Sequence, residues 1–521
     1  MFQRFSLRSL SFFLFWSLLF SIAYTQYPLF SSNQNTYFLP GFACAGIGNL
    51  TSDWQANTHD PAPLFSALVC FTLRFLRWHA VFYLYYALIL GIYFQTFFKL
   101  VQFQLDLSSR TIRLVILAAI FLLHAAGTRF LLGHLLGPEW SYVLEGGLAN
   151  QRLLGSVFQP SVFGVFLLLS IRFAIENRYQ SAVICLAVAA WFHPTYLLPG
   201  SILMLTILTL IWQENHPRHS PITLSSFKPL MPLLALFLIL ITPVVFYVLL
   251  TFASVPAEIS RQAAEILVRV RIPHHADPRV WFNLTSLFQL GILIGAIFIV
   301  RHKKIKRLLL LPLLVGSLLS VTQILTRSHS LALLFPWRIS VVLFPLAMSV
   351  WLAGFGKKLL SLVTKLSSSS LASWLLPASS TAVITICVLV GWLRFTLDLQ
   401  RFYSAPEWPL YHYVQDHLSP QDIYLIPPKM EYFRLSAGAA AYVDFKSSPY
   451  QAAEVIEWYR RLSRVNQFYS SPTCAVLRSF QQENVTHLVL PKSTSLTCSF
   501  LTPEFETDSY LLYKLQALPV K

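Results

Sequence analysis

Charged side chains are scarce in this sequence, and acidic side chains are the scarcest of them. Only 12% of the 521 residues are charged, and 22 Asp and Glu face 39 Lys and Arg. A soluble globular domain carries about 25% charged residues, so the composition excludes an ordinary water-soluble enzyme. Hydrophobic residues make up 55% of the chain, and the mean hydropathy is +0.58. The composition therefore predicts a polytopic membrane protein.

Several motifs with a known chemistry are missing as well. The six cysteines contain no CxxC pair, which excludes the usual structural zinc sites and redox motifs. No glycine-rich phosphate loop follows a predicted strand near the C-terminus, which argues against a nucleotide site there. The net charge of +17 is spread over short Lys/Arg clusters between apolar runs. No nucleic-acid-binding motif accompanies these clusters, so we expect no nucleic-acid partner.

Long apolar runs follow one another almost without pause from residue 9 to residue 396. A membrane-spanning helix needs roughly 20 apolar residues, and by this measure we expect about eleven spans. They lie near residues 9–26, 80–98, 113–131, 159–175, 180–196, 198–213, 229–252, 282–301, 308–326, 332–354 and 373–396. The sequence thus predicts an all-α polytopic membrane domain at residues 1–398.

The composition becomes that of a soluble domain at residues 399–521. Strands are predicted near 422–426, 440–445, 487–490 and 510–514, and helices near 408–417, 450–465 and 476–482. Strands that alternate with helices indicate a layered sheet, so we expect a soluble α/β domain. Cys474 and Cys498 would pair in this domain if it faces an oxidising compartment.

Clusters of Lys and Arg between the spans predict the orientation of the chain. The run RHKKIKR, residues 301–307, and the pair Lys357 and Lys358 fall on the same side as the N-terminus. Basic loops stay in the cytoplasm, so the N-terminus is expected to be cytoplasmic. An odd number of spans then places the C-terminal domain outside, together with the first outer loop at 27–63 and the loop at 253–281.

Residues Leu64–Trp78 are apolar, contain Arg74 and Arg77, and are too short for a full span. Such a segment suits a helix that lies along the membrane surface. An alternative is that it extends the second span at a tilt.

Polar residues of catalytic type gather on the predicted outer face, and the cytoplasmic face has no comparable set. Each has an ordinary structural reading: Asp60 before Pro61 is a typical turn residue, and His193 before Pro194 can simply end a helix. An arginine at membrane depth, in contrast, is costly and is normally paired or functional. The candidates are Asp53, His59, Asp60, Glu139, Glu145, His193, His274, His275, Asp277 and Arg338.

These residue types suit transfer of a sugar from a polyprenyl-phosphate carrier. The reaction needs a carboxylate as general base and cations for the departing phosphate. We expect Asp53 or Asp60 to be the base. Arg338, with His193, His274 or His275, would bind the phosphate, because the guanidinium fork binds two oxygens at once. His274, His275 and Asp277 are also candidate ligands of a divalent metal, although the HExxH spacing is absent.

The order of these parts resembles the glycosyltransferase C superfamily of polyprenyl-phosphate-dependent enzymes. The shared features are a first span, an outer loop with an acid (Asp53 in TSDWQ), an interfacial helix, about ten more spans and an outer C-terminal domain. The resemblance implies a lipid-linked sugar donor and a catalytic acid at Asp53. Many members carry a second acid beside the first, whereas here Asp60 follows seven residues later, so Asp53 and Asp60 both remain candidates.

Several short segments of the sequence are also similar to a family of bacterial multi-pass membrane proteins, common in cyanobacteria, to which no activity is assigned. The shared segments are NQNTYFLPG, DWQANTHDP, FHPTYLLP, RIPHHADP, FPWR, VDFKSSPY and EWYRRL. This resemblance implies a bacterial protein. With the orientation predicted from the Lys and Arg clusters, we expect it in the inner membrane, with the C-terminal domain in the periplasm and membrane lipids as neighbours.

Two other functions fit the pattern. A solute transporter or lipid flippase would use the outer polar residues as a vestibule and the His193–Pro194 break as a binding site. It would also need ionisable residues along a path through the spans, and these are few: His124, Arg129 and Arg338.

A membrane scaffold would bind periplasmic partners through the C-terminal domain, with the helix around Trp458–Arg461 as the contact. The sequence does not specify the sugar, the acceptor or the oligomeric state.

Overall fold

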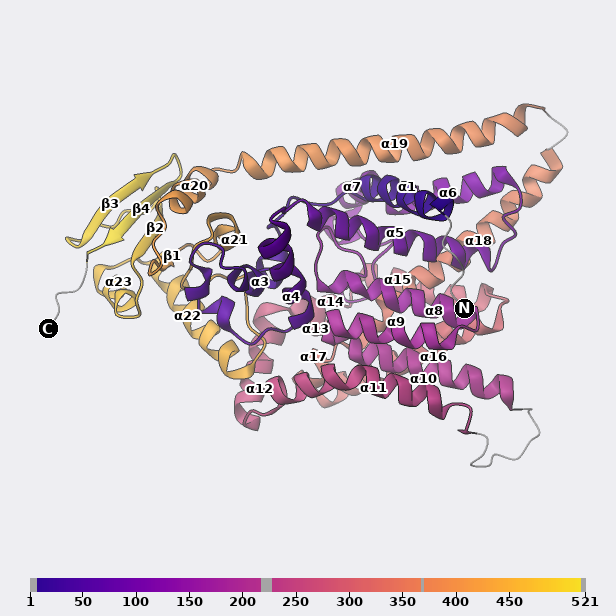
Figure 1. Cartoon of the computed structure of the whole chain (residues 1–521), viewed down its shortest axis with the longest axis horizontal. Coiled ribbons are helices and arrows are strands. Elements are labelled where there is room, and N and C mark those ends of the chain that lie inside the picture. Colours follow the sequence, from indigo (N-terminus) through magenta and orange to yellow (C-terminus); the bar gives the residue numbers. More distant parts are fainter. Residues whose placement is uncertain (1–6, 217–226, 367–369, 517–521) are drawn as a thin grey trace. The chain divides into compact units, whose positions relative to one another are not determined.

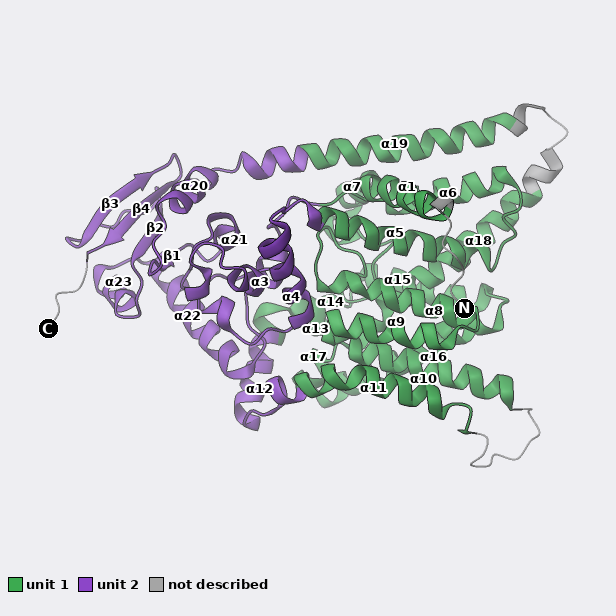
Figure 2. Cartoon of the chain, viewed as in Figure 1, with its two compact units in different colours: residues 1–26, 83–248, 268–396 green, residues 27–82, 249–267, 397–521 purple. Residues whose placement is uncertain are grey.

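The computed structural model describes residues 7–216, 227–366 and 370–516. The predicted cytoplasmic N-terminus falls on residues 1–6, outside the described residues. The chain forms two compact units, each made of three segments (Figure 2). Unit 1 contains residues 1–26, 83–248 and 268–396, and unit 2 contains residues 27–82, 249–267 and 397–521.

Unit 1 is built from apolar helices, the longer of which run side by side (Figure 1). Helix α8 packs on α9, α9 on α11, α10 on α16, and α15 on α18. The helices of this unit are α1 (Leu7–Tyr24), α5 (Val81–Gln102), α6 (Arg110–His124), α7 (Ala126–Leu136), α8 (Val165–Ile175), α9 (Tyr179–Phe192), α10 (Leu197–Asn215), α11 (Met231–Val248), α13 (Pro273–Ala276), α14 (Pro278–Trp281), α15 (Leu284–Ile299), α16 (Lys303–Thr326), α17 (His329–Leu333), α18 (Ser340–Leu366) and α19 (Ser370–Tyr403). The first residues of α5 and the last of α19 belong to unit 2.

The chain is a multi-pass membrane protein. Among the described residues, six helices are long and apolar enough to cross a membrane, or seven if the bent pair α6 and α7 forms one span. Each predicted span has a helical counterpart, but those near residues 9–26, 159–175, 180–196 and 282–301 are shorter than a full span. Pairs of helices approach closely at small residues. A Cβ at Gly391 of α19 would collide with the backbone of Ile22 in α1, so the contact requires glycine.

Unit 2 joins the first loop of the chain to its C-terminal region. Residues 27–63 and 253–281 were predicted as loops of the membrane domain. Residues 27–82 and 249–267 belong to this unit, and residues 268–281 belong to unit 1. Its helices are α2 (Gln34–Tyr37), α3 (Leu39–Cys44), α4 (Pro63–Phe71), α12 (Ala257–Ile266), α20 (Trp408–His417), α21 (Phe433–Ala437), α22 (Ala452–Ser470) and α23 (Cys474–Gln481). Helix α12 packs on α22.

A small mixed sheet forms in unit 2, with strand order β1-β2-β4-β3. Strand β1 pairs parallel to β2, and β4 pairs antiparallel to both β2 and β3. The strands are β1 (Tyr424–Leu425), β2 (His487–Pro491), β3 (Leu501–Glu506) and β4 (Tyr510–Leu515). One apolar core joins the sheet to α20 and α21 through Val489, Leu512, Leu410 and Phe433. The predicted helical membrane fold with a C-terminal α/β region is confirmed.

Two disulfides lie in unit 2. Cys474 pairs with Cys498, the pairing expected for an oxidising compartment, and Cys44 pairs with Cys70, which the sequence analysis did not predict. The second bridge ties α3 to α4. Cys185 and Cys387, both in unit 1, are free and buried.

Candidate functional site

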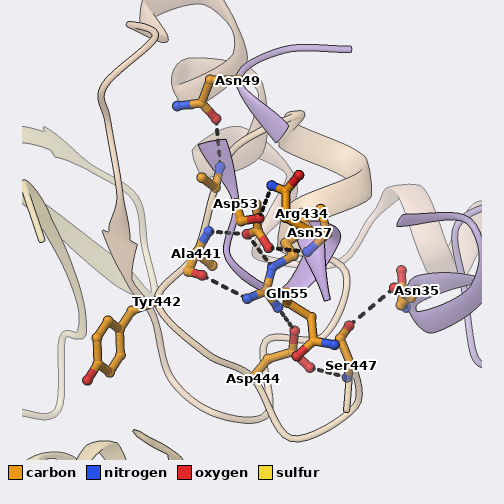
Figure 3. A network of polar contacts seen from close by, with 12 residues as sticks. Asn35, Asn49, Asp53, Gln55, Asn57, Arg434, Ala441, Tyr442, Asp444 and Ser447 are labelled. Atoms are coloured by element: carbon orange, nitrogen blue, oxygen red, sulfur yellow. Dashed lines mark hydrogen bonds and ion pairs between the residues drawn. The ribbon is translucent and has the colours of Figure 1, made fainter. Parts of the chain in front are cut away.

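Asp53 lies inside a polar network of unit 2 (Figure 3). Its side chain is only 1% exposed. Its Oδ1 accepts a hydrogen bond from the backbone N–H of Ala56 at 2.9 Å, and its Oδ2 accepts from Arg434 Nε at 2.6 Å and from the N–H of Ala441 at 2.9 Å. Both oxygens of this carboxylate therefore have partners within the fold.

Arg434 binds a second buried carboxylate, that of Asp444. Burial raises the pKa of Asp444, although the neighbouring guanidinium lowers it. The backbone N–H of Ser447 donates to Asp444 at 2.6 Å, and the indole of Trp458 donates to its carbonyl at 3.0 Å. One guanidinium thus serves two carboxylates, one from the first loop and one from the C-terminal region.

In this geometry Asp53 is an ion-pair partner that links the first loop to the C-terminal region within unit 2. Asn49 adds to the same connection, since its amide donates to the carbonyl of Asp422 at 2.8 Å and accepts from Ala440 N–H at 2.7 Å. To take a proton from an acceptor, the Asp53 carboxylate would first have to leave Arg434. The assignment of Asp53 as the base stays a prediction.

The neighbouring acid and histidine also have local partners. Asp60 Oδ1 accepts from the N–H of Ala62 at 2.8 Å, just ahead of α4, and burial raises the pKa of Asp60. His59 lies at the surface, and its Nδ1 is 2.7 Å from the carboxylate of Glu454. Asp60 thus has the contact of a turn residue.

The predicted phosphate ligands of unit 1 do come together. Arg338 lies on a 3-10 helix (Pro336–Ile339) directly before α18, and His193 ends α9. The Arg338 Nη1 donates to His193 Nε2 at 2.8 Å and to Thr195 Oγ1 at 2.6 Å. Because His193 accepts at Nε2, its ring is neutral. The Nε of Arg338 is buried and has no hydrogen-bond partner.

His275 belongs to the same electrostatic neighbourhood. Its Nδ1 is 2.7 Å from the carbonyl oxygen of Ala149. Burial lowers the pKa of His275 to about 3, and the charges of His274, Arg338 and Arg152 lower it further. His275 is therefore neutral near pH 7, and Arg152 joins Arg338 as a cation of this cluster.

The histidine pair does not fit a metal site. The His274 and His275 ring centroids are 4.1 Å apart, but the Nδ1 of His275 is engaged by a carbonyl oxygen. Asp277 forms an ion pair with Arg279 at 2.9 Å. Among the described residues, no group of three or more His, Cys, Asp or Glu side chains could hold a metal ion.

Glu145 is buried beside this cluster, whereas Glu139 is exposed. Glu145 Oε1 lies 3.4 Å from Arg129 Nη1 and accepts from the Tyr24 hydroxyl at 3.3 Å. Burial raises the pKa of Glu145 to about 7, and the nearby Arg129 and Arg152 only partly offset that effect.

A pocket opens next to Glu145 within unit 1. It holds about 250 Å³ of empty space, part of it open to solvent, and most of its lining is polar. The lining residues are Glu139, Tyr142, Gly146, Gly147, Asn150, Gln151, Arg152, Thr285 and Gln289. Gln289 donates to the Gly146 carbonyl at 3.0 Å, and the Arg152 guanidinium lies 3.5 Å from the Tyr142 ring centroid.

Solved structures with a similar fold exist. The crystal structure of ArnT from Cupriavidus metallidurans bound to undecaprenyl phosphate matches with a TM-score of 0.51 at 12% sequence identity, over 97% of each chain. The fold is ArnT-like. The same ArnT in the apo state matches with a TM-score of 0.50 at 10% identity, again over 97% of each chain. The predicted multi-pass helical architecture is thereby confirmed as a fold.

Sequence comparisons add one local match. Residues 405–465 match a family model described as a domain of unknown function, DUF6798. This segment contains Arg434, Asp444 and Trp458, and so includes the C-terminal half of the Asp53 network. The sequence has no match among curated proteins.

Several of these residues were not predicted. Arg434 lies outside the quoted segments, and Asp444 lies in VDFKSSPY but was not a candidate. The signal for both was that a buried aspartate needs a cationic partner. Thr195, Gln151, Arg152 and Gln289 were not singled out, although the first three lie in stretches that already carried candidates, WFHPTY and LEGGLANQR. Hydroxyl and amide residues are too common for composition to mark them.

Proposed function

We propose that the protein is a membrane glycosyltransferase that takes its sugar from a polyprenyl-phosphate carrier. The ArnT-like fold supports this function, and the ArnT crystal structure carries undecaprenyl phosphate. The cationic cluster of unit 1 is made of the cations Arg338 and Arg152 with the neutral rings of His193 and His275, and it is the proposed site of the carrier phosphate.

The observation that carries the proposal is the state of Arg338. No carboxylate pairs with its guanidinium among the described residues, and its Nε is buried without a partner. Its hydrogen bonds go to neutral groups, His193 and Thr195, and its guanidinium also lies over the rings of Phe335 and Tyr196. A guanidinium in a membrane protein is costly to leave uncompensated. A phosphate matches it in charge and in the bidentate geometry of the fork.

The reaction follows from these charges. The acceptor hydroxyl attacks the anomeric carbon, the bond from that carbon to the phosphate oxygen breaks, and the phosphate leaves with the electron pair. Arg338 and Arg152 would stabilise the negative charge that develops on the leaving oxygen. A carboxylate would accept the proton of the hydroxyl.

Four acids are candidates for that base, and their local geometry differs. Asp53 is held by Arg434 and Asp60 by Ala62, whereas Glu139 is exposed and lines the pocket of unit 1. Glu145 is buried, but burial brings its pKa to about 7, which is the range that suits a general base. We therefore place Glu139 and Glu145 ahead of Asp60 and Asp53.

We also propose that the reaction takes place on the extracytoplasmic side of the membrane. The four cysteines of unit 2 are paired and the two of unit 1 are free. Disulfides form in oxidising compartments, so this distribution supports a periplasmic unit 2, as the positive-inside pattern also does.

The direct test is binding of undecaprenyl phosphate to the full-length protein in detergent. Arg338→Gln should weaken binding about 10- to 100-fold, since a hydrogen bond to a charged group contributes about 1.5–3 kcal/mol. Arg338→Lys should recover only part of the affinity, because Lys lacks the fork. Arg261→Gln, which removes an exposed arginine paired with Glu258, is the matched control and should bind normally. Equal binding by all four proteins would overturn the proposal.

A further inference from the structure

A second site lies beside the cationic cluster, in the pocket of unit 1 that the loop between α7 and α8 forms. We infer that this pocket binds the ring of an uncharged hexose, the sugar that the carrier delivers. This inference rests on the proposed function and names the part of the substrate that the phosphate site does not touch.

The first reason is a buried amide without partners. Gln151 lines the pocket and is 4% exposed, yet neither its amide nitrogen nor its amide oxygen has a hydrogen-bond partner. Leaving a buried polar group unpaired costs free energy, so such a group calls for a ligand that can both donate and accept. A sugar hydroxyl does both.

The second reason is the chemistry of the remaining lining. Asn150 and Gln289 contribute amides and Thr285 contributes a hydroxyl, whereas Gly146 and Gly147 add no side chain. Arg152 and Glu139 carry opposite charges, which cancel in the lining. This set suits a neutral ligand rich in hydroxyl groups and disfavours an apolar one.

The pocket is also tied to the proposed phosphate site by two hydrogen bonds of the same loop. The N–H of Leu148 donates to Ser340 Oγ at 2.8 Å, two residues after Arg338, and the carbonyl of Ala149 contacts His275 at 2.7 Å. Ala149 and Asn150 take left-handed backbone conformations, with φ of 58° and 52°. The turn they form sets Gln151 and Arg152 beside the cluster.

The test compares undecaprenyl phosphate with undecaprenyl phosphate linked to glucose, galactose or mannose, all bound to the full-length protein in nanodiscs. The wild type should bind at least one sugar-linked form 10-fold or more tightly than the bare carrier. Gln151→Leu should abolish that gain and leave affinity for the bare carrier unchanged. Gln102→Leu, the same change at an exposed glutamine outside the pocket, should behave as wild type.

A measurement of the melting temperature tests whether Gln151→Leu still folds. Gln151→Leu removes an unpaired buried amide, so the melting temperature of the ligand-free protein should stay the same or rise. No sugar-dependent gain in the wild type, or a gain that survives Gln151→Leu, would overturn the inference while binding of the bare carrier upholds the proposed function. Failure of the bare carrier to bind would instead overturn the proposed function, and with it this inference.

Discussion

At the residue scale, Arg434 is the most demanding side chain in unit 2, because it neutralises two buried carboxylates. Arg434→Met would leave Asp53 and Asp444 buried without their cation. Breaking a buried ion pair in this way costs about 3–5 kcal/mol. We expect a large fall in the melting temperature of the full-length protein in detergent, or no folded protein at all.

Asp53→Asn should be milder. Asparagine keeps an oxygen for the N–H of Ala56 and leaves Arg434 with Asp444 as a one-to-one pair. Its NH2 group cannot accept from the N–H groups of Arg434 and Ala441, which now donate to Oδ2. We expect a loss of about 1–2 kcal/mol in the free energy of unfolding. An unchanged melting temperature combined with lost transferase activity would contradict the structural role and restore Asp53 as the leading base.

The buried carboxyl of Glu145 predicts a pH dependence of stability. Its pKa rises from 4.5 to about 7 in the folded protein because of burial. Between these values the folded state keeps a proton that the unfolded state has lost, so the free energy of unfolding should fall as pH rises from 4.5 to 7. The shift corresponds to about 3 kcal/mol. Melting curves of wild type and Glu145→Gln across this range measure it, and parallel curves would disprove it.

Residue types predicted the cluster of Arg338 and His193, but not the network around Asp53. Histidines and an arginine at predicted helix ends in the membrane are conspicuous because ionisable groups there are expensive, and Arg338 and His193 do make contact. The partner of Asp53 lies 381 residues away. No local pattern joins such positions, so the sequence pointed to Asp53 as a free acid.

At the element scale, α4 and the π-helical turn after it, Thr72–Leu76, have two unlike faces. Phe65 and Val69 are fully buried, whereas Phe75 and Trp78 are more than 60% exposed. The left-handed Arg77 ends the segment before α5 begins at Val81. The segment is therefore a separate helix and not an extension of the second span.

We expect the exposed aromatic face of this helix to lie in the lipid interface. A fluorophore on Phe75→Cys, in the full-length protein in nanodiscs, should be quenched by lipids that carry a nitroxide near the headgroup. The same label on Asp508→Cys, an exposed turn residue between β3 and β4, should be quenched much less. Equal quenching at both positions would show that the helix does not prefer the lipid surface.

Hydrophobic runs predicted the helices well, because apolar length alone decides them in a membrane. Helix α20 has the predicted bounds, 408–417. Strand β3 was missed because it contains Pro503 and is mostly exposed, so no alternation marks it. The segment predicted as a strand at 440–445 forms only an isolated bridge to Tyr424, since Ala441 and Asp444 are engaged by Arg434.

At the scale of the whole molecule, the four cysteines of unit 2 form disulfides, whereas the two cysteines of unit 1 are free. We expect unit 2 to be periplasmic, and an alkaline phosphatase fused after residue 521 should be active. A maleimide reagent added to the denatured, unreduced protein should label only Cys185 and Cys387, and after reduction it should label all six cysteines.

A host strain without its periplasmic thiol oxidase provides the control for this experiment. Protein from that strain should accept six labels without reduction. Six labels on unreduced protein from the normal strain, together with an inactive fusion, would place unit 2 in the cytoplasm and remove the extracytoplasmic reaction from the proposal.

Unit 2 is assembled from pieces made at very different times. Asp53 emerges from the ribosome hundreds of residues before Arg434 is synthesised, and most of the membrane helices are inserted in between. Until then Asp53 lacks the guanidinium with which it pairs in the folded unit. We therefore expect that truncation from the C-terminal end also disrupts the fold of the first loop. Loss of function in such a variant would not identify the C-terminal region as a partner-binding site.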